Sequence, residues 1–565
     1  MVELEGRAWR SDAKAAKARI PHRSLESALA DTADVKRLPD IRVRSPKQRQ
    51  GRLYPPGLGR GRIWFLALAC AASAFCPEEP RLRAVEDNHR MILITDLEGE
   101  QDDSQMIVRL LMYANEMDIE GLIAVSISDP GYPARAPSEP HRIGVHTEGL
   151  VKAIRAYAIV RPSLLKNAPG WPSADYLMSR VGAGPYGYGM ASVGDGQGTP
   201  GTRLIAGAVE KPDPRPIYVC ITGGANPLAQ ALWDYRKAHT PEQVKAFVAK
   251  IRVYEDYGQD DAGASICHNF PDIPWIRSLN QVFGLMGPGP PHMPPGRSQT
   301  NREPYVWQPY PPTDEGQHLW MKEHIQHDHG PLGALYPDRV ERDGRFRYLE
   351  GGNTSTWIGL VNKGLCDPEH MDWGGWGGRY QAGKMQIPAG QGRVRTGDGE
   401  KPYEPFAMHP DASDQWTDPE TGKTYNDVWT PIQRWRRAYE NDFQARMEWC
   451  VKDFKDAHHN PIAALNGDLT RKVVYLTAGA AERITLDASA SGSPDKDALD
   501  FRWFPYPEAG TYKGGISIQH ADEKVAQAVI PADGAGTQIH IILEVRTRNP
   551  VIPLFAYRRI VVAVK

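Results

Sequence analysis

The chain has 565 residues, of which 41% are hydrophobic, 24% charged and 9% aromatic. This composition is typical of a globular protein and excludes a chain disordered throughout, a collagen and a multi-span membrane protein. The formal net charge of −2 excludes the strong basic excess of most nucleic-acid-binding proteins, so we expect no nucleic-acid partner. At about 100–200 residues per domain, the length predicts several domains.

The first 62 residues differ in charge from the rest of the chain. They hold fifteen Lys or Arg against seven Asp or Glu, a net charge of +8, which leaves −10 for the remainder. They also hold few large apolar residues and show little periodicity. Such a segment cannot bury enough surface to offset the entropy of ordering, so residues 1–62 are predicted to be a disordered basic extension.

A short apolar run follows at residues 63–76 (IWFLALACAASAFC), directly after Arg60 and Arg62. Basic residues, an apolar run and a small-residue stretch (Ala72-Ser-Ala74) are the three parts of a secretory signal peptide, and the run is too short to span a bilayer. Because signal peptides lie at an N-terminus, we expect the start codon to be assigned too far upstream. The alternative is a buried hydrophobic segment. The signal-peptide interpretation predicts a periplasmic or secreted protein without membrane contact after cleavage.

Short apolar runs then alternate with helical patterns. Strands are predicted at 91–95, 119–125, 216–221 and 251–254, and helices at 106–113 and 226–233. This alternation predicts a mostly parallel open sheet with flanking helices, in which ligands bind at the carboxyl ends of the strands.

The rest of the chain divides into three parts. Residues 283–316 are rich in Pro and Gly, which predicts a long surface insertion. The apolar spacing at 429–447 predicts one amphipathic helix that closes a first domain, 88–467. Short alternating segments separated by turn signals predict an immunoglobulin-like β-sandwich at 469–565.

The strongest chemical signal follows the first predicted strand. Five carboxylates lie within residues 96–103 (DLEGEQDD), and gathering them at a strand end is costly unless a cation binds among them. Their oxygens are the ligands that Ca²⁺ and Mg²⁺ prefer. One alternative is a solvated acidic turn that caps the next helix. Another is a haloacid dehalogenase-type phosphatase, but that chemistry needs an aspartate in place of Glu98.

The acidic motif resembles the Asp-x-Asp-x-x-x-Asp-Asp signature of nucleoside hydrolases, and residues 222–229 (TGGANPLA) resemble their second metal-loop motif. More specifically, the chain resembles the secreted cellulose-binding proteins that carry a nucleoside-hydrolase-like domain before a β-domain. The segments that carry this resemblance are 160–165 (VRPSLL), 174–177 (ADYL), 223–233 (GGANPLAQALW), 259–261 (QDD), 269–271 (NFP) and 374–380 (GGWGGRY).

The resemblance implies a role for several residues. Asp96 and Asp103 would bind Ca²⁺ through their side chains, and Asn226 through its backbone carbonyl. Asp102 would hold sugar hydroxyls. Glu98 stands where nucleoside hydrolases have the aspartate that deprotonates the metal-bound water, which then attacks the anomeric carbon.

Two further positions depend on the same resemblance. Asn269 aligns with a sugar-binding asparagine that follows a later strand. The late aspartate of the hydrolase metal site has no counterpart, because Gly352 occupies its place. We expect Glu350 or Asn353 to substitute for it, and Asn353 is the predicted metal ligand.

Four residues are candidates for direct contact with a substrate. Asp260 and Asp261 follow the predicted strand 251–254, where they contact substrate or cap the next segment. Trp373 and Trp376 lie in a glycine-rich stretch, where their rings either present flat faces to a sugar or pack in the core.

Together these features predict a secreted, metal-dependent glycoside hydrolase-like protein that acts on a sugar or plant-type polysaccharide, with Ca²⁺ as cofactor. The predicted partner is a carbohydrate such as cellulose. The first alternative is a non-catalytic cellulose-binding or other carbohydrate-binding protein. The second is a nucleoside N-ribohydrolase, for which the sequence shows no base-binding signature.

Overall fold

The computed structural model describes residues 88–97, 101–126, 144–283, 309, 314–340, 346–347, 351–385 and 406–565. The predicted basic extension, the predicted signal peptide, Glu98, Glu350 and most of the predicted 283–316 insertion lie outside these ranges. The described residues belong to one compact unit, Pro80–Lys565. No helix in the described ranges is long and apolar enough to cross a membrane.

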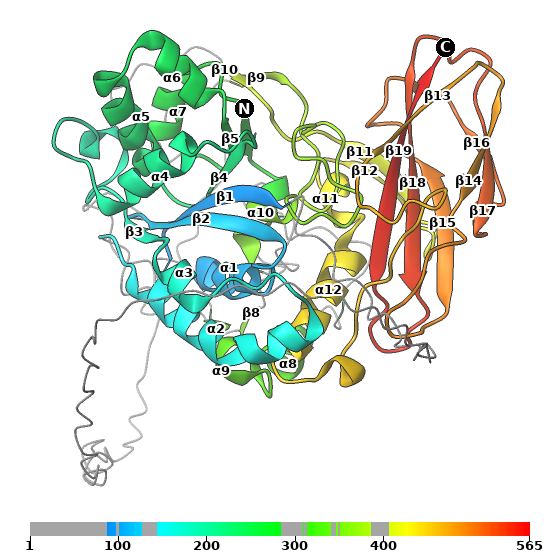
Figure 1. Cartoon of the computed structure of the whole chain (residues 1–565), viewed down its shortest axis with the longest axis horizontal. Helices are drawn as coiled ribbons and strands as arrows, with labels where there is room; N and C mark the ends of the chain where they lie inside the picture. Colours follow the sequence, from blue (N-terminus) through cyan, green and yellow to red (C-terminus); the bar gives the residue numbers. More distant parts are fainter. Residues whose placement is uncertain are drawn as a thin grey trace, which may run out of the picture. The chain divides into compact units, whose positions relative to one another are not determined.

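A six-stranded parallel sheet forms the centre of the first part of the chain (Figure 1). Its strands are β1 (His89–Thr95), β2 (Met117–Ala124), β3 (Val181–Ala183), β4 (Ile217–Ile221), β5 (Ile251–Asp256) and β6 (Trp275–Ser278). Their order is β3-β2-β1-β4-β5-β6, so the direction of winding reverses between β1 and β4. Ligands of open α/β sheets bind outside the carboxyl ends of the strands at such a reversal.

Helices cover both faces of this sheet, as Figure 1 shows. One core contains residues of α1 (Gln101–Leu111), α2 (Glu148–Asn167), α10 (Ser355–Ile358) and α12 (Arg436–Glu448). The opposite core contains residues of α4 (Pro200–Glu210), α5 (Asn226–Ala238), α6 (Pro241–Val248) and α7 (Ala262–Asn269). The shorter helical elements are α3 (Ala174–Met178), η1 (Gly189–Ser192), η2 (Gln281–Phe283), α8 (Asp314–Met321), η3 (Lys322–Gln326), α9 (Gly330–Gly333), η4 (Gly352–Thr354), α11 (Thr430–Gln433) and η5 (Phe454–Asp456).

The two covered faces explain why the strands are continuous apolar runs. In β1, Met91 and Leu93 belong to the first core, whereas Ile92 and Ile94 belong to the second. All four side chains are fully buried. Burying one such side chain contributes about 1.5–3 kcal/mol, and a strand covered on both faces gains this at every position.

Three small antiparallel pairs and a break in one helix complete this part. The pairs are β7 (Arg339–Val340) with β8 (Phe346–Arg347), β9 (Gly383–Met385) with β10 (Phe406–Met408), and β11 (Asp414–Thr417) with β12 (Thr424–Asp427). The prediction of one helix at 429–447 is wrong in one respect, because α11 and α12 are separate. Trp435 between them has φ −101° and ψ 1°, which interrupts the helical backbone.

The C-terminal part is a β-sandwich of two sheets. Its strands are β13 (Val474–Ala478), β14 (Arg483–Asp487), β15 (Leu499–Pro505), β16 (Ser517–Gln519), β17 (Val525–Val529), β18 (Gln538–Thr547) and β19 (Phe555–Val564). One sheet has the order β13-β19-β18-β15 and the other β14-β17-β16. The pairings of strands two to seven are those of an immunoglobulin-type sandwich. The first strand, β13, pairs in parallel with the last.

The sandwich shares a core with the α/β part. Tyr506 and Tyr557 of the sandwich belong to the same buried cluster as Trp435, and the rings of Trp435 and Tyr557 lie 5.5 Å apart. The Tyr506 hydroxyl donates a hydrogen bond to Asp414 at 2.6 Å. The two parts are therefore joined by apolar and polar contacts, not only by the linking chain.

A buried ionic network lies at the same junction. Glu116, in the turn between α1 and β2, binds Arg446 of α12 at 2.6 Å and Arg471, just before β13, at 2.8 Å. Lys363 lies 3.5 Å from Glu116 and 3.3 Å from Asp442. Burial favours the neutral acid, but the positive charges of Lys363, Arg471 and Arg446 outweigh it and hold the pKa of Glu116 well below its usual value.

Candidate functional site

Acidic and amide side chains meet at the carboxyl ends of three adjacent strands, β1, β4 and β5. Asp96 follows β1, the segment 222–226 follows β4, and Asp260 and Asp261 follow β5. The predicted residues that are buried here are Asp96, Asp102, Asp103, Asn226, Asp260, Asp261 and Asn353. The strand order reverses between β1 and β4, so the residues stand where ligands bind in this class of fold.

Asp103 is held by three neutral donors from separate parts of the chain. It lies in the first turn of α1, beside Asp102. Its Oδ1 accepts hydrogen bonds from the hydroxyls of Thr95 and Thr222, each at 2.7 Å. Its Oδ2 accepts one from the side-chain amide of Asn353 at 3.0 Å. The ends of β1 and β4 and the η4 turn are therefore joined through one carboxylate.

The start of α5 is fixed against the end of β5. The backbone N–H of Asn226 donates to Asp260 Oδ2 at 3.3 Å, and its side-chain amide donates to Ser192 Oγ at 2.8 Å. The backbone approaches so closely that a Cβ on Gly224 would lie 2.5 Å from Asp260 Oδ2. Glycine is thus required at this position, because any side chain would displace the carboxylate or the loop.

Asp260 has an unusual environment for a carboxyl group. Its two oxygens accept backbone hydrogen bonds at the starts of two helices, from Asn226 and, at 3.0 Å, from Ala262. Burial, followed by the nearby negative charge of Asp261, raises the pKa of Asp260 to about 7. Asp261 accepts a hydrogen bond from the Met190 backbone N–H at 2.7 Å. Asp260 is therefore harder to ionise than an ordinary aspartate.

The donor chemistry of this site suits a hard cation in part. Asp96 and Asp103 offer carboxylate oxygens. The side-chain oxygens of Asn226 and Asn353 are buried and accept no hydrogen bond from a described residue. However, the described ranges contain no group of three His, Cys, Asp or Glu side chains that could hold a metal ion. Glu98 and Glu100 lie outside those ranges.

Asn269 is not part of this arrangement. It is exposed at the end of α7, whereas Asp261 immediately precedes the start of that helix. Its side-chain amide donates to Ser265 at 2.8 Å and its oxygen accepts from Arg236 at 3.3 Å. Since each helical residue adds about 1.5 Å, α7 carries Asn269 away from the carboxyl edge of the sheet, contrary to the loose alignment that suggested a sugar contact.

Trp373 and Trp376 are packed in the core, which corrects the prediction that their rings face a sugar. Only 4% of Trp373 and 1% of Trp376 is exposed. The ring of Trp373 stacks on His370 at 3.7 Å between centroids and meets His540 of the sandwich edge-on at 4.7 Å. The indoles therefore join the glycine-rich segment to the rest of the protein.

Several polar residues that the sequence did not single out support this site with hydroxyl and amide groups. Thr95 and Thr222 hold Asp103, and Gln259 donates to the Thr222 carbonyl at 2.8 Å. Thr222 is the first residue of the TGGANPLA motif, so the motif could have indicated its role. Thr95 directly precedes the acidic motif but has no pattern of its own.

Comparisons with known proteins identify the family of the chain. A family model described as "Cellulose-binding Sde182, nucleoside hydrolase-like domain" matches residues 90–380, and one described as "Cellulose-binding protein Sde0182, C-terminal domain" matches residues 483–564. A solved structure from Saccharophagus degradans, described as a nucleoside hydrolase-related protein associated with carbohydrate metabolism, is 34% identical. The match covers 85% of this chain and 100% of that one, with a TM-score of 0.67. No curated protein matches. The chain therefore belongs to the family of cellulose-binding Sde182 proteins with a nucleoside hydrolase-like domain.

Proposed function

We propose that this protein binds a carbohydrate, with cellulose or a related plant-type polysaccharide as the substrate class, at the carboxyl edge of its parallel sheet. The description of its family as cellulose-binding supports the substrate class. The association of its S. degradans relative with carbohydrate metabolism points the same way. The predicted signal peptide supports a secreted or periplasmic location, where such a polymer is accessible.

One observation supports the location of the site. The side-chain oxygens of Asn226 and Asn353 are buried without a hydrogen-bond donor among the described residues, and leaving a polar atom in that state costs about 1–3 kcal/mol. A sugar presents several hydroxyls that donate hydrogen bonds. A carbohydrate bound at this edge would satisfy both oxygens and place hydroxyls beside Asp102.

Calcium is the cofactor that we propose for this site. Asp96, Asp103, the side-chain oxygen of Asn353 and the backbone carbonyl of Asn226 would hold it, and when bound it would supply positive charge that orients oxygen ligands. The Asn353 amide holds Asp103 through its hydrogen bond at 3.0 Å.

Hydrolysis of a glycosyl bond is the second candidate function. It is favoured by Asp260, whose pKa near 7 suits a group that gives or takes a proton at neutral pH. Glu98 is the proposed base, from the resemblance alone. Binding without turnover needs neither group, so the two functions make different predictions.

Product analysis separates them. The full chain is incubated with cellulose, cello-oligosaccharides, xylan and inosine, with CaCl₂ or with EGTA. Sugar release that is lost in Glu98→Gln, while ligand binding persists, establishes glycoside hydrolysis. Retention on cellulose with no released sugar establishes the binding protein. Release of ribose from inosine alone would contradict both candidates.

A further inference from the structure

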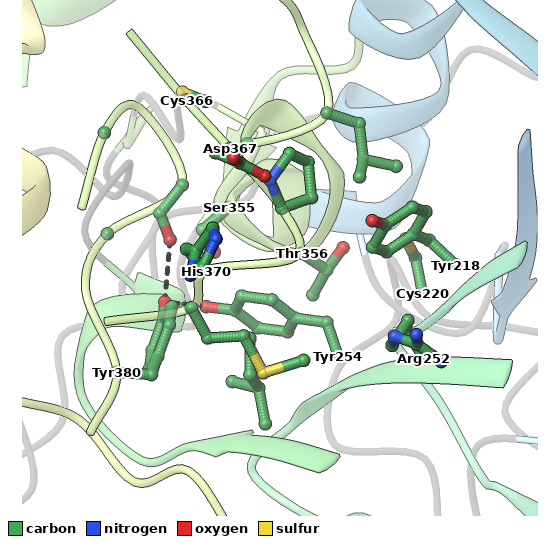
Figure 2. Close-up of a pocket in the computed structure, with 18 of the residues that line it drawn as sticks. Tyr218, Cys220, Arg252, Tyr254, Ser355, Thr356, Cys366, Asp367, His370 and Tyr380 are labelled. Atoms are coloured by element: carbon green, nitrogen blue, oxygen red, sulfur yellow. Dashed lines mark hydrogen bonds between the residues drawn. The ribbon is translucent and has the colours of Figure 1, made fainter. Parts of the chain in front are cut away.

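We propose that the cavity drawn in Figure 2 is a second binding site, which takes a neutral aromatic ring that carries a hydroxyl group. The cavity itself has a volume of about 70 Å³ and opens to solvent, within about 580 Å³ of empty space. It lies between one face of β4 and β5, helix α10 and the segment 366–380. The proposal does not depend on the carbohydrate site.

The cavity is separate from the carboxyl edge of the sheet. Tyr218 lines it and pairs in the sheet with Met91, five residues before Asp96. Tyr254 also lines the cavity. It pairs in the sheet with Cys220, which in turn pairs with Leu93, three residues before Asp96. At about 3.3 Å per residue, the lining strands place the cavity roughly 10–16 Å along the sheet from Asp96.

Aromatic and sulfur-containing side chains make the lining suitable for a flat apolar ring. Tyr218, Tyr254 and Tyr380 contribute their rings, and Met371 contributes a thioether. Figure 2 shows Tyr254 extending across the cavity toward Tyr380, with Tyr218 and Arg252 on the opposite side. Aromatic rings attract other rings edge-on or offset, and sulfur makes favourable contacts with ring edges.

The hydroxyl protons of the lining are already committed to the protein. Ser355 donates to the Val282 carbonyl and Thr356 to the Asn353 carbonyl, each at 2.7 Å. Tyr218 donates to Glu369 at 2.5 Å. The hydroxyls of Tyr254 and Tyr380 share a hydrogen bond, and Tyr380 also donates to the Gly377 carbonyl at 2.8 Å.

The committed protons leave the described hydroxyl oxygens of the lining with lone pairs toward a ligand, so a hydroxyl group on the ligand finds acceptors there, and His370 adds an imidazole to the same lining. The Tyr254 hydroxyl is the best placed acceptor. When Tyr380 donates its proton to the Gly377 carbonyl, Tyr254 donates its own proton to the Tyr380 oxygen, which leaves the lone pairs of Tyr254 for a ligand. A ring with one hydroxyl can donate to these lone pairs. A sugar ring carries many more polar groups than such a lining can pair, and each unpaired buried hydroxyl weakens binding.

The charges around the cavity favour a neutral ring. Arg252 binds Glu369 at 2.9 Å, so the one guanidinium in the described lining is already neutralised. Asp367 adds a negative charge to the lining, and it accepts the backbone N–H of Glu369 at 3.1 Å. The buried Arg559 donates to the Gly374 carbonyl of the lining at 2.8 Å and interacts with Asp367, so it offsets that charge. The charges around the cavity are therefore balanced, and a neutral ring fits them better than an anion or a cation.

One wall of the cavity is closely packed. A Cβ on Gly377 would lie 2.8 Å from the Gly359 Cα, and one on Gly375 would lie 2.5 Å from the Cys366 sulfur. These glycines let backbone segments pack directly on one another. A preformed pocket binds without first paying the entropy of ordering its walls.

Calorimetric titration of the full chain at pH 7 with 4-ethylphenol tests the proposal. We expect saturable binding, about tenfold weaker binding of the methyl ether 4-ethylanisole, and no competition by cellobiose. Met371→Trp, which fills the cavity from a half-exposed position, should abolish binding. Tyr254→Phe should weaken the binding of 4-ethylphenol five- to tenfold, because about one hydrogen bond is lost. The same variant should leave the binding of ethylbenzene unchanged.

Tyr186→Phe is the matched control, since Tyr186 is 79% exposed, and it should bind as the parent does. Circular dichroism melts establish that each variant is folded. No saturable binding in the parent would overturn the proposal. So would binding that persists in folded Met371→Trp, equal affinity for the phenol and its methyl ether, or tighter binding of cellobiose or of a benzylammonium ion.

Discussion

The side-chain amide of Asn353 donates to the carboxylate of Asp103 at 3.0 Å, between residues 250 positions apart in the sequence. This contact joins η4 to the start of α1 at the carboxyl edge of the sheet. It also places an amide where the resemblance to nucleoside hydrolases leads one to expect an acidic metal ligand. The contact therefore links two residues that the sequence predicts as metal ligands.

Asn353→Asp should make the protein more dependent on calcium. Without a cation, a second carboxylate beside Asp103 should lower the free energy of unfolding by about 1–3 kcal/mol, because like charges repel and a hydrogen bond is lost. Calcium at 100 times its Kd should restore about 2.7 kcal/mol. Urea unfolding with EGTA or CaCl₂ measures both effects. Asn426→Asp, on the exposed face of β12, is the control, and equal calcium effects in the two variants would refute the metal site.

Thr222→Val should destabilise the junction of β1 and β4. The substitution keeps the shape of the side chain but removes the hydroxyl that binds Asp103 at 2.7 Å. Weakening the support of a buried carboxylate costs about 1–3 kcal/mol. Thr424→Val removes a hydroxyl from an exposed pair with Thr417 and should change stability by less than about 0.5 kcal/mol. Similar losses in the two variants, measured by urea unfolding, would show that the Asp103 network is not a stabilising element.

Gly224→Ala should destabilise the protein, whereas Gly207→Ala should not. A Cβ at Gly224 would lie 2.5 Å from Asp260 Oδ2, but one at Gly207 meets no atom within 4 Å. Overpacking costs about 1–3 kcal/mol. Gly207 lies inside α4, where alanine should add about 0.5–1 kcal/mol. Thermal melts of the two variants should therefore shift in opposite directions, and a neutral Gly224→Ala would mean that the loop is less closely packed than the distance implies.

The ionic network around Glu116 predicts a loss of stability in acid. The folded protein holds the pKa of Glu116 below the ordinary value of 4.5 despite its burial. Its contribution is thus fully present above about pH 4.5 and is lost as the pH falls through the lower folded pKa. Glu116→Gln should cost about 3–5 kcal/mol at pH 7, because it leaves buried cations uncompensated. It should also flatten the acid limb of a plot of stability against pH, and an unchanged acid limb would contradict this role.

The sequence predicted the parts of the fold that depend on local pattern. Strands β1, β2, β4 and β5 are apolar runs buried on both faces, and each coincides with a predicted segment. β3 has only three residues, and β6 contains Arg277, which is buried because it pairs with Glu255 at 2.6 Å. β3 is too short to show an apolar pattern. The pattern of β6 is broken by Arg277, whose acidic partner Glu255 is distant in the sequence.

The residues of the candidate site also divide into those that a local pattern predicts and those that depend on distant partners. Asp96 directly follows β1, Asp103 lies in the first turn of the next helix, and Asp260 and Asp261 lie in the loop after β5. The rule that parallel strands end at one edge was therefore enough to bring them together. Asn353 needed the resemblance, because no local pattern ties it to α1. The correction of Trp373 and Trp376 has a different reason: an aromatic residue beside glycines packs equally well against backbone or a ligand, and only the sandwich decides which.

One binding experiment decides whether the carboxyl edge is a carbohydrate site. The full chain is titrated with cellohexaose by calorimetry in CaCl₂ and in EGTA, beside its Asn226→Leu variant, with folding checked by circular dichroism. We predict saturable binding that weakens in EGTA and is lost in the folded variant, because Asn226 supplies one of the two unsatisfied oxygens. Binding that is unchanged in the variant, or no binding of the parent in either buffer, would contradict the proposed site.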